Sequence, residues 1–192
     1  MARIALDIDS TLHHYWDLLD RIAQDRYGVA LPYAEQADWG ITQLERQQLI
    51  ECVTETHSDE NIEAAEPYDG AVEAVNRWHQ AGHFIHVTSH RRETCAPATR
   101  RWLEATDIPY DDLHCSFDKL TRCVELDIEV LVDDSPVNIA GARERGMVAA
   151  TLVHPWNEEL VNGGDDGVIG AEDWPELERR LAPFLTSSRP DA

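Results

Sequence analysis

Residues 3–11 read Arg3-Ile4-Ala5-Leu6-Asp7-Ile8-Asp9-Ser10-Thr11. The stretch begins with a short apolar run of the kind that forms a buried strand, and two aspartates follow it at once. Alternate residues of an extended chain point to the same side, so we expect the carboxylates of Asp7 and Asp9 to face one crevice.

Further apolar runs follow this one, and stretches with helical length and composition separate them. The strand-like runs are 83–87, 128–132 and 147–153, with a weaker one at 113–116. The helix-like stretches between them are 71–81, 94–105, 118–126 and 136–145. This alternation predicts an α/β fold, with a Rossmann-like parallel sheet and helices on both faces.

Residues 13–66 interrupt the alternation. Residues 15–27 and 42–56 both look helical, and no clear strand separates them. We therefore expect a small all-helical cap, residues 13–66, inserted after the first strand and lying over the crevice. The core then consists of residues 1–12 and 67–192. Its tail should contain a loop at 163–167, a helix at 174–185 and a frayed end at 186–192.

The composition is that of a globular protein with an acidic surface. Of 192 residues, 43% are hydrophobic and 28% are charged, and the formal net charge is -21. Such a surface repels nucleic-acid backbones and anionic lipids, so we expect neither a polynucleotide nor a membrane partner. No apolar run approaches the roughly 20 residues of a membrane helix, and the start does not resemble a signal peptide. These features predict a cytoplasmic protein. The oligomeric state stays open, a homodimer included.

The cysteines predict neither a metal knuckle nor a redox pair. Cys52, Cys95, Cys115 and Cys123 form no CxxC motif. In a reducing cytosol such residues are expected to be reduced, mostly buried thiols.

Polar residues also follow two later strands. Thr88 and Ser89 end the second strand, and Asp133 and Asp134 follow the third. In an open α/β sheet the ligand site lies at the carboxyl ends of the strands, so these distant segments should converge. Hydroxyl and backbone N–H groups at such a turn suit phosphate oxygens, although the same hydroxyls often cap helices.

A cluster of carboxylates at one crevice needs a cation. Asp134 is a natural third oxygen ligand beside Asp7 and Asp9, and Mg²⁺ is a hard cation that prefers oxygen. Its charge would also let an anionic phosphate approach. Lys119 can neutralise charge on phosphoryl oxygens and orient a nucleophile, although most lysines are solvated surface residues.

The order and spacing of these groups resemble the haloacid dehalogenase superfamily of phosphotransferases. Its pattern is an apolar strand followed by DxDxT, a later strand ending in Thr or Ser, a lone Lys, and an acidic pair after a strand. The matching residues are Asp7-Ile8-Asp9-Ser10-Thr11, Thr88, Lys119, Asp133-Asp134 and Asn138.

The resemblance implies a role for each matched residue. Asp7 would attack phosphorus and carry an aspartyl-phosphate, and Asp9 would act as acid and then as base. The phosphate-binding residues would be Thr88, Ser89 and Lys119. A Mg²⁺ ion would be held by a carboxylate oxygen of Asp7, the backbone carbonyl of Asp9 and the carboxylate of Asp134.

Within that superfamily the chain is similar to the 5'(3')-deoxyribonucleotidase family, which has a small helical cap and hydrolyses nucleoside monophosphates with Mg²⁺. The similar segments are 66–71, 82–83, 87–91, 118–119 and 133–136. The implied substrate is a small-molecule phosphate ester, with a nucleoside or deoxynucleoside monophosphate as the first choice. The alternatives are a sugar phosphate, phosphoserine, transfer to an acceptor other than water, or a catalytically inactive ligand-binding protein. Ser10 gives DxDST, similar to phosphoserine phosphatase, but the second and fourth motifs of that family are absent.

Basic residues near the motifs have two interpretations. Arg91, Arg92 and Arg122 either raise the potential at the crevice mouth or are ordinary solvated helix charges. Partial desolvation beneath a closing cap is expected to raise the pKa of Asp9, which must be protonated when the nucleophile attacks.

The histidines and tryptophans around the crevice also leave two interpretations. His13, His14 and His90 either contact substrate or lie at the hinge and surface. Trp16 and Trp39 either stack on a base or form the core of the cap.

Overall fold

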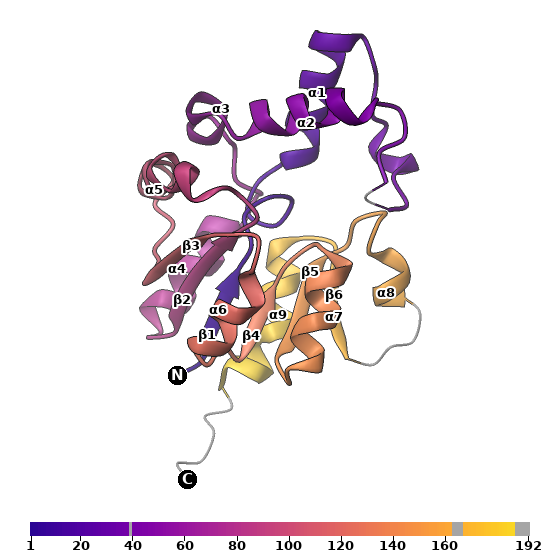
Figure 1. Cartoon of the computed structure of the whole chain (residues 1–192). Helices are drawn as coiled ribbons and strands as arrows, with labels where there is room; N and C mark the ends of the chain where they lie inside the picture. Colours follow the sequence, from indigo (N-terminus) through magenta and orange to yellow (C-terminus); the bar gives the residue numbers. More distant parts are fainter. Residues whose placement is uncertain (39, 163–166, 187–192) are drawn as a thin grey trace.

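The computed structural model describes residues 1–38, 40–162 and 167–186, which form a six-stranded parallel sheet (Figure 1). The strands are β1 (Arg3–Leu6), β2 (Phe84–Ser89), β3 (Asp112–Cys115), β4 (Val130–Val132), β5 (Val148–Leu152) and β6 (Val168–Ala171). Their order in the sheet is β3-β2-β1-β4-β5-β6. The strand with the two aspartates is therefore central, and the predicted Rossmann-like sheet is confirmed.

Helices lie between consecutive strands and after the last one. They are α1 (Tyr15–Tyr27), α2 (Arg46–Thr56), α3 (Asp59–Glu63), α4 (Ala71–Gln80), α5 (Ala96–Ala105), α6 (Lys119–Glu125), α7 (Pro136–Glu144), α8 (Glu158–Asn162) and α9 (Trp174–Thr186). Single 3₁₀ turns lie at η1 (Tyr33–Glu35) and η2 (Glu93–Cys95).

Alternate residues of the central strand bury against opposite layers of helices. Ile4 and Leu6 belong to an apolar cluster with side chains of α4, α5 and α9. Ala5 belongs to a second cluster with side chains of α6 and α7. All three strand residues are fully buried. This two-residue period is what a sheet covered on both faces requires, and it confirms the predicted layers.

The segment between β1 and α4 is helical and lies over the carboxyl ends of the strands, where α1 and α2 stand apart from the sheet (Figure 1). It has its own apolar cluster, formed by Tyr15, Trp16, Leu19, Ile22, Ala23, Leu31, Leu44, Cys52 and one residue from outside the segment, Trp156. We propose that residues 13–66 are the cap and that residues 1–12 and 67–192 are the core.

Several short elements differ from the prediction. Strand β6 was missed because only four residues, with a glycine among them, pair at the sheet edge. Helices α3 and α8 were missed because each has five residues, too few to show a period. Helix α2 begins at Arg46 rather than residue 42, because Glu45 and Gln48 form a capping box there.

Other expectations meet the structure only in part. The four cysteines are free and buried. Within the described ranges, no helix combines the length and the apolar character needed to cross a bilayer. Most of the predicted loop at 163–167 and nearly all of the frayed end at 186–192 lie outside the described residues.

His86 in β2 predicts a stability that falls in mild acid. Its side chain is fully buried, and burial lowers its pKa to about 4 although the Asp112 carboxylate, 3.0 Å away, favours the charged form. The folded-state pKa lies below the unfolded value, so the unfolded chain binds the proton more readily as pH drops. The contribution is complete above pH 6.5 and is lost as pH falls toward 4.

We expect His86→Val to flatten this pH dependence. Between pH 7 and pH 5, the wild-type free energy of unfolding should fall by about 2 kcal/mol more than that of the variant. Urea unfolding at both pH values measures the difference. The control is His79→Gln at a partly exposed position of α4, which should keep the wild-type slope. Equal slopes for wild type and His86→Val would exclude this role of His86.

Candidate active site

A cavity of about 290 Å³ lies where the cap meets the carboxyl ends of the strands. Of the six residues predicted to act in catalysis, phosphate binding or metal binding, four line it: Asp7, Asp9, Lys119 and Asp134. The cap contributes Tyr15, Val53 and His57, and the remaining lining residues are His90, Asp133, Ser135 and Asn138. The cavity therefore joins segments that are far apart in the sequence.

Lys119 joins two of the aspartates. Its Nζ donates to Oδ1 of Asp7 at 2.5 Å and to Oδ2 of Asp133 at 3.0 Å. All three residues are almost completely buried. Burial alone would lower the pKa of Lys119, but the carboxylates of Asp133 and Asp7 raise it above its usual value. Lys119 is also the only lysine in the sequence.

The start of α6 places this lysine. The Asp118 side chain accepts a hydrogen bond from the backbone N–H of Thr121 at 3.2 Å and so caps the helix. Lys119 then occupies the first turn of a helix that packs beside α7 and β3. The Asp118-Lys119 step thus combines a helix cap with an inward-pointing cation.

Asp133 and Asp134 differ in how their oxygens are used. Asp133 accepts hydrogen bonds from the Ser135 N–H at 2.9 Å, from Asn138 Nδ2 at 3.0 and 3.1 Å, and from Lys119. Its oxygens are therefore engaged by donors. Within the described residues, the Asp134 carboxylate accepts a hydrogen bond from Trp156 Nε1 at 3.1 Å. Asp134 is thus the freer of the two to bind a cation.

The cluster fits a divalent metal. Oxygens of Asp7, Asp133 and Asp134 lie within 4.8 Å of one another, and all three residues are buried. Burial raises the pKa of Asp7 to about 7, and burial together with Asp7 and Asp133 raises the pKa of Asp134 well above its usual value. Both shifts mean that Lys119 alone does not balance the carboxylates. A set of buried oxygen donors with excess negative charge suits Mg²⁺.

The pKa of Asp9 differs from the prediction. Arg91 holds it with two hydrogen bonds, Nη2 to Oδ1 at 2.6 Å and Nε to Oδ2 at 3.2 Å. His13 Nε2 lies 2.9 Å from Oδ1, and the Ser89 hydroxyl donates to Oδ2 at 3.1 Å. Burial raises the pKa of Asp9, but Arg91 and the His13 hydrogen bond outweigh it and hold this pKa well below its usual value. The predicted rise was wrong because Arg91 is itself buried beside the carboxylate.

Thr88 and Ser89 lie beside the cavity but do not line it. Thr88 follows Val87, which is the register partner of Leu6, so Thr88 stands next to Asp7. Its hydroxyl is buried and has no hydrogen-bond partner within the described part of the chain. An unpaired buried hydroxyl is costly, and a phosphate oxygen would satisfy it. Ser89, by contrast, is already bonded to Asp9.

A second cavity of about 470 Å³ adjoins the first and shares Val53, His57 and His90 with it. Its apolar lining comes from Leu49, Ile50 and Val53 of α2 together with Cys95 and Phe117, and its polar residues include Arg92 and Thr94. Sequence reasoning missed His57, whose Nε2 lies 3.7 Å from Oδ2 of Asp9. No local pattern marks a histidine at a helix end as part of a site.

The remaining candidates take different places. Trp16 is buried, and its indole N–H donates to the Leu31 carbonyl at 2.9 Å, so it belongs to the core of the cap rather than to a base-stacking surface. Trp39 lies outside the described residues. Arg122 of α6 pairs with Asp112 of β3 and with Glu125, and it does not line the cavity.

Comparison with known proteins gives one relative and a common fold. No protein-family model matches the chain. A protein of Chlorobaculum tepidum named "Putative 5'(3')-deoxyribonucleotidase" is 22% identical over 195 residues, covering 95% of this chain and 91% of that protein.

Two solved structures share the overall arrangement. A HAD family hydrolase from Deinococcus radiodurans, with bound phosphate and sodium, has a TM-score of 0.67 at 16% identity and covers 98% of this chain and 99% of its own. A predicted phosphatase from Clostridium acetobutylicum has a TM-score of 0.67 at 14% identity, with 95% and 98% covered. At these identities the likeness establishes the fold.

Proposed function

Since the chain has the fold of the haloacid dehalogenase superfamily, we propose that it is a Mg²⁺-dependent phosphomonoesterase that acts on nucleoside or deoxynucleoside monophosphates. One observation carries the proposal: three distant segments place Asp7, Lys119, Asp133 and Asp134 in one buried cluster. Excess buried charge of this kind opposes folding, so its presence argues for a functional site.

Asp7 is the nucleophile in this proposal. A carboxylate oxygen of Asp7 forms a bond to phosphorus while the bond from phosphorus to the ester oxygen breaks. Lys119 orients the carboxylate through its bond to Oδ1 and offsets charge on the phosphoryl oxygens. Water then attacks phosphorus, which releases inorganic phosphate and restores the free carboxylate.

Asp9 handles the proton in both steps. It gives a proton to the leaving ester oxygen and takes one from the attacking water. Arg91 keeps Asp9 ionised in this arrangement, which suits the base role directly. The acid role requires Asp9 to be protonated, and the two-point contact with Arg91 must then loosen when the leaving group is present.

The metal ligands proposed are a carboxylate oxygen of Asp7, the backbone carbonyl of Asp9 and the carboxylate of Asp134. A bound Mg²⁺ would supply positive charge that offsets the negative charges of the phosphate and the carboxylates. Asp133 fits a supporting role instead, because its oxygens hold Lys119 and the start of α7 in place.

The leaving group is assigned to the second cavity. It shares His57 and His90 with the catalytic cavity, and its volume of about 470 Å³ lies within the range of small-molecule pockets. Apolar side chains of α2 would cover the flat face of a nucleobase. The 22% identical relative, whose name includes deoxyribonucleotidase, supports the same substrate class.

A substrate panel tests the proposal. We expect kcat/KM for purine or pyrimidine monophosphates to exceed that for a sugar phosphate or phosphoserine by at least about tenfold. Removing Mg²⁺ with EDTA should abolish turnover, and adding it back should restore turnover. Equal rates for all esters would favour the general small-ester alternative. Binding of phosphate without turnover of any ester would indicate the inactive ligand-binding alternative.

One variant tests whether the second cavity causes the preference for nucleotides. Ile50→Glu places a charge on its α2 wall and should lower kcat/KM for nucleotides while sparing 4-nitrophenyl phosphate. The matched control is Val124→Glu, which exchanges a similarly exposed residue on α6 that lines neither cavity. Including an alcohol acceptor in the assay, and measuring its phosphorylated product, detects transfer to a group other than water.

A further inference from the structure

The loop after β5 connects three parts of the candidate site. Trp156 donates to the Asp134 carboxylate, and Asn157 Nδ2 donates to the Asp134 backbone carbonyl at 3.0 Å. Trp156 also packs into the apolar cluster of the cap, 5.4 Å from Trp16 between ring centroids. One short loop of the core therefore contacts both a proposed metal ligand and the cap.

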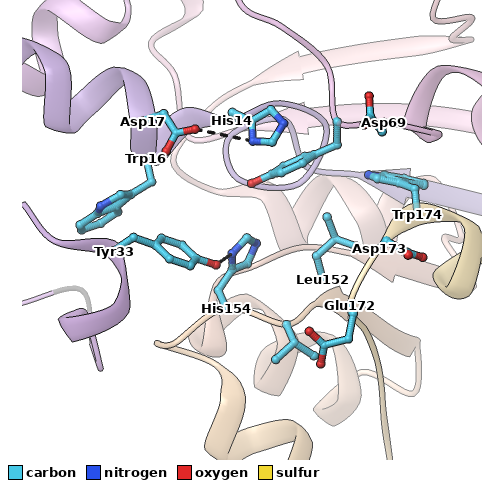
Figure 2. Close-up of a pocket in the computed structure, with 12 residues that line it drawn as sticks. His14, Trp16, Asp17, Tyr33, Asp69, Leu152, His154, Glu172, Asp173 and Trp174 are labelled. Atoms are coloured by element: carbon cyan, nitrogen blue, oxygen red, sulfur yellow. Dashed lines mark hydrogen bonds and ion pairs between the residues drawn. The ribbon is translucent and has the colours of Figure 1, made fainter.

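His154 in this loop extends the connection to the nucleophile strand. Its Nε2 lies 2.7 Å from the backbone carbonyl oxygen of Ser10, and its Nδ1 lies 2.7 Å from the Tyr33 hydroxyl. Figure 2 shows the Tyr33 side chain of the cap reaching the His154 ring of the core. Ser10 directly follows Asp9, so a single imidazole connects the cap with the turn that follows Asp7 and Asp9.

The chemistry of the two contacts fixes the tautomer. A backbone carbonyl only accepts, so Nε2 of His154 carries the proton and donates it. In the neutral ring Nδ1 then accepts from the Tyr33 hydroxyl. Burial lowers the pKa of His154 to about 4, which keeps the ring neutral at neutral pH. Both ring nitrogens are therefore used, one on each side of the boundary between cap and core.

The Ser10 turn needs such support. Ser10 has a φ of 58°, a left-handed conformation that is unfavourable for a residue other than glycine. It is fully buried, so losing the His154 contact would leave its carbonyl oxygen away from water without that donor. The turn also sets the direction of Asp9, whose backbone carbonyl is a proposed metal ligand.

We propose that His154 is a positioning residue that holds the Ser10 turn in the geometry required by Asp7 and Asp9 and joins it to the cap through Tyr33. The inference rests on the proposed phosphatase reaction for its kinetic consequences. Its structural part, that one ring supports two segments, is independent of the substrate.

Three substitutions separate the two contacts. His154→Gln keeps a donor near the Nε2 position and loses the acceptor for Tyr33. Tyr33→Phe loses only the cap contact, and His154→Leu loses both. The matched control for Tyr33→Phe is Tyr68→Phe. Both rings line the same cavity, but only the Tyr33 hydroxyl forms a hydrogen bond within the part of the chain that the structure describes.

Amide hydrogen exchange tests each contact without an activity measurement. Exchange in residues 7–13 should accelerate in His154→Leu and stay near wild type in His154→Gln and Tyr33→Phe. Exchange in residues 31–36 should accelerate in all three variants and not in Tyr68→Phe. If His154→Leu does not fold, His154→Asn, whose amide is too short to reach Ser10, tests the same contact.

Kinetics with 4-nitrophenyl phosphate give the functional readout. We expect kcat to fall by about tenfold to a hundredfold in His154→Leu with little change in KM. In His154→Gln most of this loss of kcat should be restored. Unchanged exchange in residues 7–13 for His154→Leu, or no recovery by glutamine, overturns the inference even if the wild type is an active phosphatase. A wild type without phosphatase activity overturns the proposed function, while the exchange data still decide whether His154 positions the turn.

Discussion

Replacing Asp7 by asparagine is expected to lower turnover of every phosphate ester by at least about a thousandfold. The amide has nearly the shape of the carboxylate but is a poor nucleophile, so no phosphoenzyme should form. The fold should survive, because Lys119 keeps its bond to Asp133 and one of the clustered carboxylates is removed. Turnover of 4-nitrophenyl phosphate and thermal unfolding measure the two effects.

A matched exposed substitution and a trapping experiment complete the test. Asp59→Asn on α3 changes a largely exposed carboxylate paired with Arg101 and should leave turnover unchanged. Acid quenching of wild type during turnover should give an intact protein with the added mass of one phosphoryl group, and Asp7→Asn should give none. Near-wild-type turnover by Asp7→Asn would remove Asp7 from the mechanism.

The parts of the fold that the sequence predicted are those with strong local patterns. The apolar run at residues 3–6 became β1 with the expected bounds, and residues 15–27 became α1. Strand β6 is four residues at an edge, and its place depends on pairing with β5. Such pairing is a long-range property that composition does not record.

The candidate site also has parts that the sequence predicted and parts that it did not. Positions after strands could be predicted, because parallel strands end at one edge of the sheet. The partner of Asp9 could not, because Arg91 lies beyond the end of β2 and only the fold turns it inward to the carboxylate. The position of Arg91 in the sequence is equally compatible with an arginine at the crevice mouth that does not contact Asp9.

Lys119 and Trp156 differ in how clearly the sequence marks them as site residues. The sequence contains one lysine and fifteen arginines. The single lysine, Lys119, lies where a compact ammonium group fits between carboxylates. That signal was present in the sequence. Trp156 carries no comparable mark, because its bond to Asp134 appears only when the loop after β5 folds over the cluster.

Replacing this lysine by methionine is expected to destabilise the metal-free protein by about 3–5 kcal/mol at neutral pH. Methionine fills similar space but leaves the buried carboxylates of Asp7 and Asp133 without their ammonium partner. The folded-state pKa of Asp7, already raised to about 7 by burial, should rise further above its unfolded value, so stability is retained at low pH and lost as pH rises toward the folded-state pKa. The deficit should therefore be smaller at pH 5 than at pH 8, as urea unfolding at the two pH values will show.

Magnesium distinguishes a metal site from a simple buried ion pair. If the carboxylates bind the ion, millimolar Mg²⁺ should stabilise Lys119→Met in the unfolding experiment, and Asp134→Asn introduced into that variant should weaken the effect. Arg179→Met on α9 is the control, because its side chain is largely exposed and its ion pair within the described residues is with Glu176, so it should change stability by less than about 0.5 kcal/mol. A Lys119→Met protein as stable as wild type at pH 8 without metal would mean that the cluster is not strained by excess charge, and the main argument for a cation there would be lost.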